Sequence, residues 1–445
     1  MKVPTALAVG GIDTGNGAGV ESDVRAMGAV GVHGVLAPTA VTVQTTLGIF
    51  KVLPIDPSVL GETLERLYED FEFRVAKTGM IWKGQARVVK EFVKSHDITA
   101  VVDPVLRAKD GTALIPDTEE FGELLRVANT VTPNVPEAEA LSGTKIVTLK
   151  DQIEACESIS RKYGVQNVVV KGGHLSGYDV GCFQGERVII KGEIYPTKDT
   201  HGTGSAFASF FAALLARGED HVTAFERTVA LVKESVKRSL RVGKGAGPVN
   251  LLASLWVESQ RFRAVQDMLK VGTFIESAEG FHELIPEVQM NVAHSVEPEL
   301  VRGLEDVATF RDRITKTWDN RVRVGYPVVF GKPTHTARLL LSAISKGSDY
   351  TFAVNIRFSE RALRVLRAYY SDVVEVNRDE EPAEEKGVEG KSMEWVVTRA
   401  MQANSNMVPH VIFDRGTKGK EAMIRLLVSD VDELLSVFEY LLRKS

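Results

Sequence analysis

Hydrophobic runs of strand length alternate with longer helical patterns over about the first 245 residues. Two of the runs, VVDPV (101–105) and VVVKGG (168–173), are continuously apolar, which is typical of strands covered by helices on both faces. Strands separated by helices of this length need crossover connections, so the pattern predicts a mostly parallel sheet. The strands are predicted at 5–9, 34–43, 74–78, 99–103, 129–132, 167–170, 187–194 and 194–197, and the helices at 20–30, 85–95, 151–163, 204–216 and 222–242.

The alternation stops at RVGKGAGPVNLLAS (241–254), where three glycines and Pro248 within six residues break the preceding helix. We therefore predict a first domain at 1–247, a linker at 248–261 and a second, smaller α/β domain at 262–445. In the second domain the pattern predicts strands at 323–330, 350–356 and 410–413, and helices at 335–345, 360–368 and 431–442.

The composition excludes several classes of protein. A chain of 445 residues exceeds what one hydrophobic core usually serves. Its 54 Lys and Arg residues against 59 Asp and Glu give a net charge of −5, which argues against a general nucleic-acid binder. Cys156 and Cys182 are the only cysteines, so neither a disulfide framework nor a four-cysteine zinc site can form. The sequence contains no run of about 18 apolar residues and no signal-peptide pattern, so we expect a cytoplasmic protein without a membrane partner.

Two glycine-rich segments follow predicted strands and begin helices, namely GGIDTGNGAG (10–19) and DTHGTGS (199–205). Glycines let backbone amides approach a ligand, and a helix start favours negative charge. Taken alone, the first segment fits a plain strand–helix turn as well as an anion site, and a dinucleotide fold would need a ribose-binding acid that is not evident. In the second segment, the amides of Gly202, Thr203 and Gly204 would converge on one anion.

The segment 199–205 resembles the DTxGxGD signature of ribokinase-like kinases. The resemblance covers about residues 4–247 and implies a ribokinase-like, doubly wound sheet. The branch that it indicates is the hydroxymethylpyrimidine/phosphomethylpyrimidine kinases, which use ATP to convert 4-amino-5-hydroxymethyl-2-methylpyrimidine and its phosphate to the diphosphate in thiamine synthesis. The other motifs occur in the order of that branch: IDTGNGAG (12–19), Asp23, Gln44, AKTGM (76–80), VVDPV (101–105), TPNVPEA (132–138) and VVVKGGH (168–174).

The resemblance also assigns roles to individual residues. Gln44 offers both a hydrogen-bond donor and an acceptor, which suits the edge of an aminopyrimidine ring, whereas Met80 by itself would fit a core position. Magnesium carried by ATP would be held by Asp103 and Glu137. The substrate residues are Asp13, Gly19, Asp23, Gln44, Met80 and Val105. The nucleotide residues are Asn134, Lys171 and Thr203, and the catalytic residues are Lys171, Gly202, Thr203, Gly204 and Ser205.

Ser205 departs from the resemblance, because the kinase branch commonly has Cys at this position and the wider superfamily has Asp. A thiolate or a carboxylate can accept a proton near neutral pH, whereas a serine hydroxyl titrates too high to do so. Phosphoryl transfer depends chiefly on positioning and charge stabilisation, so the loss of a base need not abolish it. We therefore expect an active kinase that phosphorylates the alcohol more slowly than the monophosphate.

The second domain has a high density of arginine beside the ends of predicted strands. Arginine is the favoured side chain for forked recognition of phosphate oxygens. GKPTHTAR (331–338) places His335 and Arg338 on one face of a helix start, and DRGTKGKEAM (414–423) adds a glycine-bearing loop with Lys420. The pattern indicates a phosphorylated ligand, and the alternative is a set of surface arginines without one. The arginines concerned are Arg321, Arg323, Arg338, Arg357, Arg378 and Arg415.

The order of segments over about 262–445 resembles the ThiN-type thiamine-phosphate synthase domain. The matching segments are 281–295, 321–343, 353–360, 377–382, 392–400 and 411–425. The resemblance implies that hydroxymethylpyrimidine diphosphate condenses with thiazole phosphate to give thiamine phosphate and diphosphate. We expect phosphate and diphosphate contacts from Arg321, His335 and Arg338, with Asn355, Arg357, Arg415 and Lys420 nearby. The residues expected to hold the aminopyrimidine or a metal are Glu394 and Asp414.

Two other functions fit the same residues. Domains of the ThiN type also occur as thiamine-responsive sensors fused to DNA-binding modules, although this chain is acidic and no such module is evident. The first domain could instead be a kinase of pyridoxal or another small alcohol, because ring selectivity depends on the shape of the pocket. The resemblance implies ATP and Mg²⁺ as cofactors, small-molecule substrates rather than nucleic acid as partners, and a homodimer.

Overall fold

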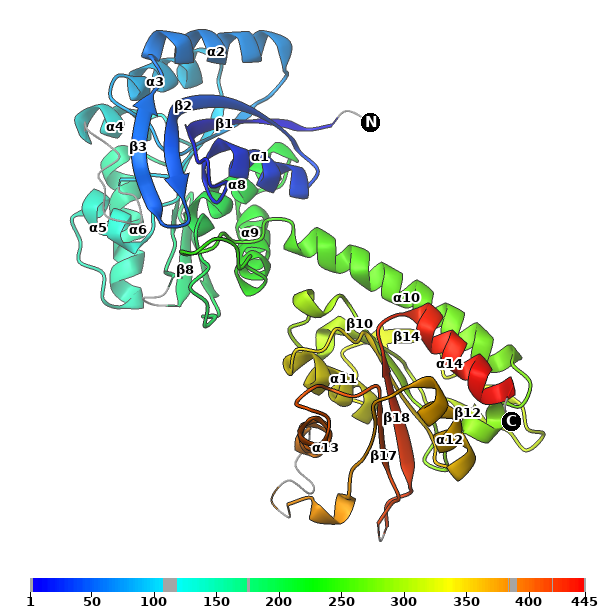
Figure 1. Ribbon diagram of the computed structural model, residues 1–445. Coiled ribbons are helices and arrows are strands. Elements are labelled where there is room, and N and C mark those ends of the chain that lie inside the picture. Colours follow the sequence, from blue (N-terminus) through cyan, green and yellow to red (C-terminus); the bar gives the residue numbers. More distant parts are fainter. Residues whose placement is uncertain are drawn as a thin grey trace. The chain divides into compact units, whose positions relative to one another are not determined.

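The structure of the protein is a computed structural model that describes residues 3–106, 118–173, 177–382, 384, 390–417 and 419–443. The chain divides into two compact units, Met1–Leu255 and Trp256–Ser445, which are described separately (Figure 1). The predicted linker, 248–261, differs from the structure, because helix α10 (Ala253–Ser277) begins inside it. Ala264, Met268, Val271 and Ile275 are buried at helical spacing, so the helical pattern of the second unit starts earlier than the glycine-rich break suggests.

Nine strands of the described residues form one sheet in the first unit, in the order β3-β2-β1-β4-β5-β6-β7-β8-β9. The six central strands run parallel to one another, namely β2, β1, β4, β5, β6 and β7. At the two edges, β3, β8 and β9 are antiparallel to their neighbours. The strand bounds are β1 (Thr5–Ile12), β2 (His33–Thr45), β3 (Gly48–Pro54), β4 (Val75–Thr78), β5 (Thr99–Val102), β6 (Thr130–Val131), β7 (Asn167–Val170), β8 (Tyr178–Phe183) and β9 (Glu186–Lys191).

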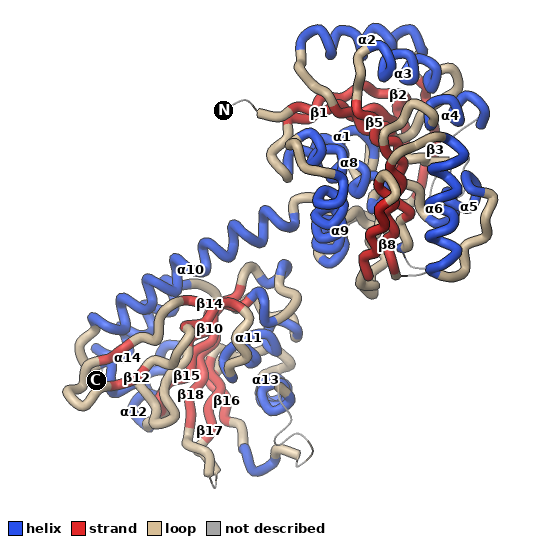
Figure 2. Tube along the Cα trace, turned by 180° about the vertical axis from the view of Figure 1, so that it is seen from behind, coloured by secondary structure: helices blue, strands red, loops and turns tan. Residues whose placement is uncertain are grey.

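Helices cover both faces of this sheet (Figures 1 and 2). Within β1, Leu7 and Val9 pack into one core and Ala6 and Ala8 into the other, because successive side chains of a strand point to opposite faces. This arrangement confirms the prediction of a doubly wound, mostly parallel sheet. One face is covered by α1 (Gly19–Ala29), α8 (Thr203–Ala216) and α9 (His221–Lys237). The other is covered by α2 (Pro57–Asp70), α3 (Gln85–Ser95), α4 (Thr118–Leu125), α5 (Val135–Ser142) and α6 (Leu149–Tyr163).

Several elements of the first unit differ from the predictions. Strand β9 ends at Lys191, and residues 194–197, which were expected to form a strand before the second glycine-rich segment, are not a strand. Pro196 removes a backbone donor there, which disfavours pairing within a sheet. The helices α2, α4 and α5 and the strands β3 and β8 were not predicted. Helix α5 depends on a local signal, since Asn134 and Glu137 cap each other's backbone amides at its start.

Seven strands of the described residues form the main sheet of the second unit, in the order β14-β11-β10-β15-β18-β17-β16. All neighbouring pairs except β16–β17 are antiparallel, so the second α/β domain lacks the parallel sheet of the first. The strand bounds are β10 (Val292–Ser295), β11 (Val307–Phe310), β14 (Val328–Phe330), β15 (Phe352–Arg357), β16 (Val373–Glu375), β17 (Val411–Asp414) and β18 (Met423–Val428), with a separate hairpin of β12 (Thr315–Lys316) and β13 (Val322–Arg323).

The helices of the second unit also lie on two faces. Helices α10, α12 (Glu360–Tyr369) and α14 (Val431–Arg443) share one core with Ile356, Phe413 and Ile424. Helices α11 (His335–Ser345) and α13 (Lys391–Ala403) cover the opposite face. Strand alternation therefore points the neighbouring residues Arg357, Asp414 and Arg425 toward the α11/α13 face. Short 3-10 helices lie at Phe281–Leu284, Pro298–Leu300, Leu304–Asp306 and Arg378–Glu380.

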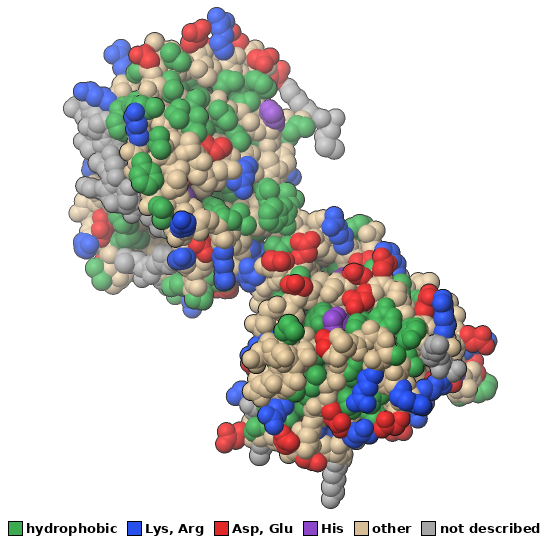
Figure 3. All heavy atoms as spheres, in the orientation of Figure 1, with side chains coloured by type: hydrophobic (Ala, Val, Ile, Leu, Met, Phe, Trp, Pro, Cys, Tyr) green, Lys and Arg blue, Asp and Glu red, His purple; other side chains and the backbone are tan. Residues whose placement is uncertain are grey.

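The surface agrees with the nearly balanced composition. Acidic and basic side chains are interspersed on the visible face of each unit (Figure 3). Among the helices that the structure describes, none combines the length and the apolar character needed to cross a bilayer.

Candidate active site

A cavity of about 860 Å³ opens at the carboxyl ends of the parallel strands in the first unit. This is the edge at which open α/β sheets bind their ligands. All the site residues predicted in the first unit line the cavity: Asp13, Gly19, Asp23, Gln44, Met80, Asp103, Val105, Asn134, Glu137, Lys171, Gly202, Thr203, Gly204 and Ser205. The structure thus brings together residues from across nearly two hundred positions of the sequence. Among the motif residues, His174 and Lys418 lie outside the described part of the chain.

The second glycine-rich segment forms the start of α8. Gly202 is the N-cap residue and adopts a left-handed conformation with φ of 82°. A Cβ atom there would lie 1.8 Å from the carbonyl oxygen of Gly17, so glycine is required for both conformation and space. Gly202, Thr203 and Gly204 at this helix start all line the cavity, which fits the predicted anion site.

A charged cluster lies next to this helix start. Lys171 Nζ is 2.8 Å from Asp103 Oδ1, and a Cβ atom on Gly204 would lie 3.4 Å from the same Nζ. Burial raises the pKa of Glu137 to about 7; Lys171 lowers it and Asp103 raises it. The cluster therefore places one cation and two carboxylates, Asp103 and Glu137, beside the amides that would receive an anion.

Ser205, which is half-buried, belongs to a second cluster whose other members, Asp23, Lys77 and Ser209, are buried. Its hydroxyl donates to Asp23 Oδ1 at 2.7 Å and accepts from Lys77 Nζ at 2.9 Å. Lys77 also pairs with both carboxylate oxygens of Asp23, at 2.8 and 2.9 Å, and both side chains are only 1% exposed. Ser209 donates to the same carboxylate at 2.6 Å. Lys77 was not predicted as a site residue, although a lysine within a strand as apolar as VAKT signals a buried charge that needs a partner.

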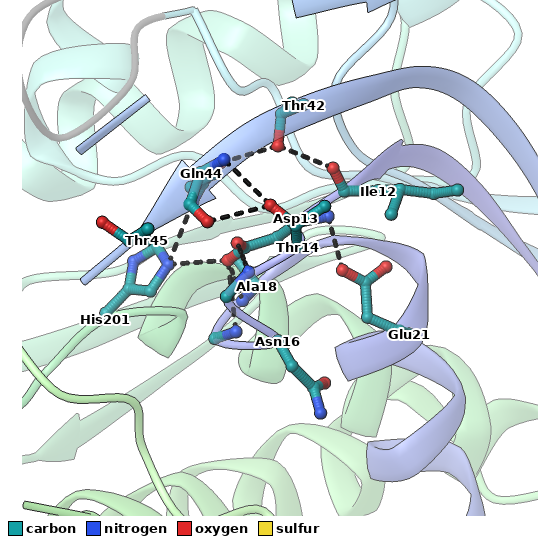
Figure 4. A network of polar contacts seen from close by, with 12 residues as sticks. Ile12, Asp13, Thr14, Asn16, Ala18, Glu21, Thr42, Gln44, Thr45 and His201 are labelled. Carbon is teal, nitrogen blue, oxygen red and sulfur yellow. Dashed lines mark hydrogen bonds and ion pairs between the residues drawn. The ribbon is translucent and has the colours of Figure 1, made fainter. Parts of the chain in front are cut away.

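A polar network around Asp13 adjoins this helix start in the cavity (Figure 4). The Asp13 carboxylate accepts hydrogen bonds from the amides of Gly15, Gly17 and Ala18, and from His201 Nε2 at 2.9 Å. Burial by itself would raise the pKa of Asp13, but the hydrogen bonds from His201 and the loop amides hold it below its usual value. His201 also contacts Gln44, and it was not predicted as a site residue although it lies inside the 199–205 motif.

Glu21 lies in the first turn of α1, and its Oε1 accepts a hydrogen bond from the Asp13 amide. Its Oε2 is buried and has no hydrogen-bond partner among the described residues. Burial raises the pKa of Glu21 to about 7; backbone hydrogen bonds oppose the rise, and the carboxylates of Asp13 and Asp23 add to it. The folded protein therefore favours the protonated form of Glu21 at pH values where an exposed glutamate is ionised.

Replacing Glu21 with glutamine should make the first unit more stable at pH 8. The folded pKa of about 7 exceeds the ordinary value of 4.5, so the folded state binds more protons than the unfolded state between these values. The contribution of Glu21 to stability is therefore full below about pH 4.5 and is lost as the pH rises through 7. Thermal melts of native and Glu21→Gln proteins at pH 5 and 8 test this: melting curves that shift equally with pH contradict the assignment.

In the second unit, His335 lies at the start of α11 among several guanidinium groups. Burial lowers the pKa of His335, and the charges of Arg338, Arg313, Arg425 and Arg378 lower it further. Arg425 Nη1 lies 2.7 Å from Asp414 Oδ2 on the neighbouring strand, on the same face of the sheet. The helix start, the imidazole and the arginines form a cationic site at the α11/α13 face, which is called the arginine cluster below. Arg313 and Arg425 were not predicted, because folding brings them near His335 from distant segments, Arg425 on β18 and Arg313 in the segment between β11 and β12.

Glu381 links Lys420 to Arg378 of this cluster. It lies 3.0 Å from Arg378 and 3.0 Å from Lys420, and its side chain is fully buried. One nitrogen of Arg378 and one oxygen of Glu381 are buried without a hydrogen-bond partner among the described residues. Lys420 is thus connected to the arginine cluster through Glu381, which pairs with both Lys420 and Arg378.

The remaining predictions for the second unit are not brought together in the same way. Arg415 pairs with Glu360 and Glu375, and it points away from Asp414 because adjacent strand residues face opposite sides. Arg321 is 85% exposed and pairs with Asp319 in the hairpin loop. Asn355 is buried, and its amide holds backbone groups of residues 289 and 291, which is a structural role. Arg357 and Glu394 are exposed, on β15 and in the first turn of α13.

Comparisons with known proteins agree with this division into two units. The family model described as phosphomethylpyrimidine kinase matches residues 13–250, and the model described as thiamine-phosphate synthase ThiN matches residues 267–439. Hydroxymethylpyrimidine/phosphomethylpyrimidine kinase from Bacillus subtilis is 37% identical over 264 residues, which cover 57% of this chain and 96% of that protein. The protein of the same name from Aquifex aeolicus is 35% identical over 252 residues, covering 54% of this chain and 97% of that protein.

Solved structures of related kinases have the fold of the first unit. Pyridoxal kinase from Bacillus subtilis, solved as an ADP complex, is 26% identical, covers 57% of this chain and 99% of its own, and has a TM-score of 0.51. Pyridoxal kinase from Staphylococcus aureus in complex with ADP is 29% identical, covers 57% of this chain and 95% of its own, and also has a TM-score of 0.51. With the fold, the cavity and the sequence matches in agreement, this chain belongs to the phosphomethylpyrimidine kinase family and carries a ThiN domain after its kinase domain.

Proposed function

We propose that the protein is a bifunctional enzyme of thiamine synthesis whose first domain makes the substrate of the second. The kinase domain phosphorylates 4-amino-5-hydroxymethyl-2-methylpyrimidine and then its phosphate, with ATP as the donor. The observation that supports this function best is that the family's motif residues, from Asp13 to Ser205, line one cavity together with a cation and an open helix start.

The arrangement of residues suits phosphoryl transfer. The amides at the start of α8 and the ammonium of Lys171 would stabilise the charge on the transferring phosphoryl group, where positioning and electrostatics supply most of the rate. The Ser205 hydroxyl directs its proton to Asp23 and accepts one from Lys77, so one lone pair is left for the substrate hydroxyl. Ser205 would thus orient the attacking oxygen without acting as the final base.

The acidic residues of the cavity fit the magnesium that accompanies ATP. Mg²⁺ usually binds one or two carboxylates together with phosphates and waters, and Asp103 and Glu137 supply two oxygen-bearing groups beside Lys171. When bound, the ion would neutralise charge on the phosphates.

The second domain would condense hydroxymethylpyrimidine diphosphate with thiazole phosphate. The bond between the pyrimidine methylene carbon and the diphosphate oxygen breaks, and the thiazole nitrogen then bonds to that carbon. The leaving diphosphate takes the electron pair, so its charge needs a cationic and partly dehydrated site. The arginine cluster supplies this environment, with His335 neutral at its centre because its pKa is lowered.

Replacing His335 with alanine should reduce thiamine phosphate formation by about 100-fold, the loss expected when one preorganised donor to a developing charge is removed. The assay supplies hydroxymethylpyrimidine diphosphate and thiazole phosphate directly, so that the kinase is bypassed. His335→Gln, which keeps an N–H donor, should retain more activity than His335→Ala, and both variants should phosphorylate hydroxymethylpyrimidine at the native rate. Unchanged synthase turnover in His335→Ala would exclude the proposed role of the arginine cluster.

The two alternative functions receive less support. The relatives from Bacillus subtilis and Aquifex aeolicus, at 37% and 35% identity, are named hydroxymethylpyrimidine/phosphomethylpyrimidine kinase, which favours the kinase of thiamine synthesis over a pyridoxal kinase. The matched ThiN model describes a synthase rather than a sensor. Incubating the full chain with hydroxymethylpyrimidine, thiazole phosphate, ATP and Mg²⁺ tests the whole proposal: thiamine phosphate should accumulate, and bound thiamine phosphate without turnover would favour a sensor.

We also propose that the enzyme is a cytoplasmic homodimer. The proposal rests on the family resemblance of the kinase domain and on the supply of ATP in the cytoplasm. Sedimentation analysis of the full chain, whose mass is 48.7 kDa, would distinguish a dimer from a monomer.

A further inference from the structure

We propose that His201 fixes the orientation of the Gln44 side-chain amide and thereby sets the selectivity of the kinase for an aminopyrimidine ring. The inference rests on the proposed function, in which Gln44 contacts the pyrimidine. It assigns to His201 a positioning role in substrate recognition, which is distinct from binding the phosphates at the neighbouring residues 202–204.

The backbone of Gln44 is held on both sides by one residue. Thr14 Oγ1 accepts a hydrogen bond from the backbone N–H of Gln44 at 2.9 Å and donates one to the backbone carbonyl oxygen of Gln44 at 2.8 Å. Gln44 itself is 9% exposed and lines the cavity. Its backbone therefore has little freedom, and the direction of its side-chain amide depends on the two groups that flank it, Thr42 and His201 (Figure 4).

The hydroxyl of Thr42 determines which end of the amide can face it. Thr42 Oγ1 lies 2.8 Å from the carbonyl oxygen of Ile12, which can only accept, so the single hydroxyl proton is used there. Toward Gln44, at 3.2 Å, the hydroxyl can then offer only a lone pair. The end of the Gln44 amide that faces Thr42 must therefore be the NH₂ group.

His201 requires the same orientation. Its Nε2 lies 2.9 Å from Asp13 Oδ2, and the Asp13 carboxylate already accepts three loop amides, so Nε2 must carry a proton. The same Nε2 lies 3.3 Å from the side-chain amide of Gln44. A protonated ring nitrogen has no in-plane lone pair to accept from an NH₂ group, so the Gln44 oxygen is the end that can face Nε2 and share the proton that it directs to Asp13. The structure places the amide nitrogen of Gln44 toward His201. The nitrogen and oxygen of an amide exchange by a half-turn, and the half-turned amide suits both Thr42 and His201.

The hydrogen-bonding groups of the Gln44 side-chain amide that Thr42 and His201 leave free match the edge of a 4-aminopyrimidine ring. With its oxygen toward His201 and its nitrogen toward Thr42, the Gln44 amide keeps one N–H and one oxygen lone pair for the cavity. The 4-aminopyrimidine edge presents an amino N–H next to a ring nitrogen acceptor, which pairs with both. A pyridine ring without that amino group leaves the Gln44 oxygen unpaired, and unpaired polar groups in a site are the main source of discrimination.

The test compares His201→Leu, which removes the ring N–H, with His201→Gln, which keeps an N–H donor of similar reach. Kinetics are measured on the full chain with hydroxymethylpyrimidine and ATP, and with pyridoxal as the competing alcohol. For His201→Leu we expect the KM for hydroxymethylpyrimidine to rise about 10-fold, the effect of losing one hydrogen bond, with the KM for ATP within twofold of native. The preference for hydroxymethylpyrimidine over pyridoxal should fall in parallel, and His201→Gln should recover part of both.

Three outcomes would overturn the inference. An unchanged KM for hydroxymethylpyrimidine in His201→Leu removes the role of His201 in recognition. An equal rise in the KM for ATP, with no recovery in His201→Gln, means that the substitution only disturbs the phosphate loop. Nitrogen NMR of the native protein, with His201→Gln used to assign the signal, gives a readout that does not depend on activity: an unprotonated Nε2 contradicts the inference, whereas failure of the native chain to phosphorylate hydroxymethylpyrimidine contradicts the proposed function instead.

Discussion

Replacing Lys77 with methionine is expected to lower the free energy of unfolding of the first unit by about 3–5 kcal/mol, the cost of leaving a buried charge without its partner. Lys77 and Asp23 are each 1% exposed, and the ammonium contacts both oxygens of the Asp23 carboxylate. Methionine has a similar length but supplies no charge, so the Asp23 carboxylate would keep only its hydrogen bonds from Ser205 and Ser209.

Thermal unfolding measures this effect. For a domain of this size about 1 kcal/mol corresponds to 2–4 °C, so the melting temperature of the first unit should fall by roughly 10 °C. The two units need separate transitions in the fit, since a single two-state curve does not describe a chain of two domains. The matched control is the double variant Lys77→Met with Asp23→Leu, in which no buried charge remains and much of the stability should return. A single variant that melts within 2 °C of native would show that the pair is not a buried ion pair.

Many of the residues that the family resemblance assigned to the kinase site line one cavity because they follow strand ends. Asp103 and Lys171 come directly after apolar strands, and the carboxyl ends of parallel strands meet at one edge of the sheet. The sequence does not reveal the order of the strands across the sheet. The carboxyl ends of parallel strands lie at the same edge whatever that order is. This is why residues as distant as Asp13 and Lys171, which the family resemblance assigned to one site, line the same cavity.

Residues whose role depends on a partner were harder to predict. Lys77 belongs to the site because its ammonium contacts the side chains of Asp23 and Ser205. His201 belongs to it because its ring contacts the side chains of Asp13 and Gln44. Ser205 was interpreted only as a missing base, whereas its position between Lys77 and Asp23 makes it an oriented hydroxyl. None of these pairings has a fixed spacing in the sequence, because each joins elements that are brought together only by folding.

The second unit shows the same limit more strongly. In an antiparallel sheet, a cluster such as His335 with Arg313 and Arg425 depends on strand register and on which face each strand presents. The density of arginine predicted a phosphate site, but it did not separate Arg425, which faces α11, from Arg415, which pairs with Glu360 on the other face. Because side chains alternate along a strand, moving a residue by one position turns its side chain to the other face of the sheet. The sequence of a turn-rich segment does not show where each strand begins, so it does not show which face a given arginine occupies.

Replacing Lys171 with glutamine should lower the kcat of the kinase by about 10²–10³-fold, as expected when one group that stabilises transition-state charge is lost. Lys171 would contact the transferring phosphoryl group, because its Nζ lies beside the helix start, 3.4 Å from where a Cβ atom on Gly204 would stand. Lys191→Gln, at the exposed end of β9, removes the same charge outside the cavity and should retain native activity. The loss should appear when thiamine phosphate is made from hydroxymethylpyrimidine and ATP, and it should disappear when hydroxymethylpyrimidine diphosphate is supplied. A Lys171→Gln enzyme that makes thiamine phosphate equally fast from both precursors would show that the phosphate site lies elsewhere.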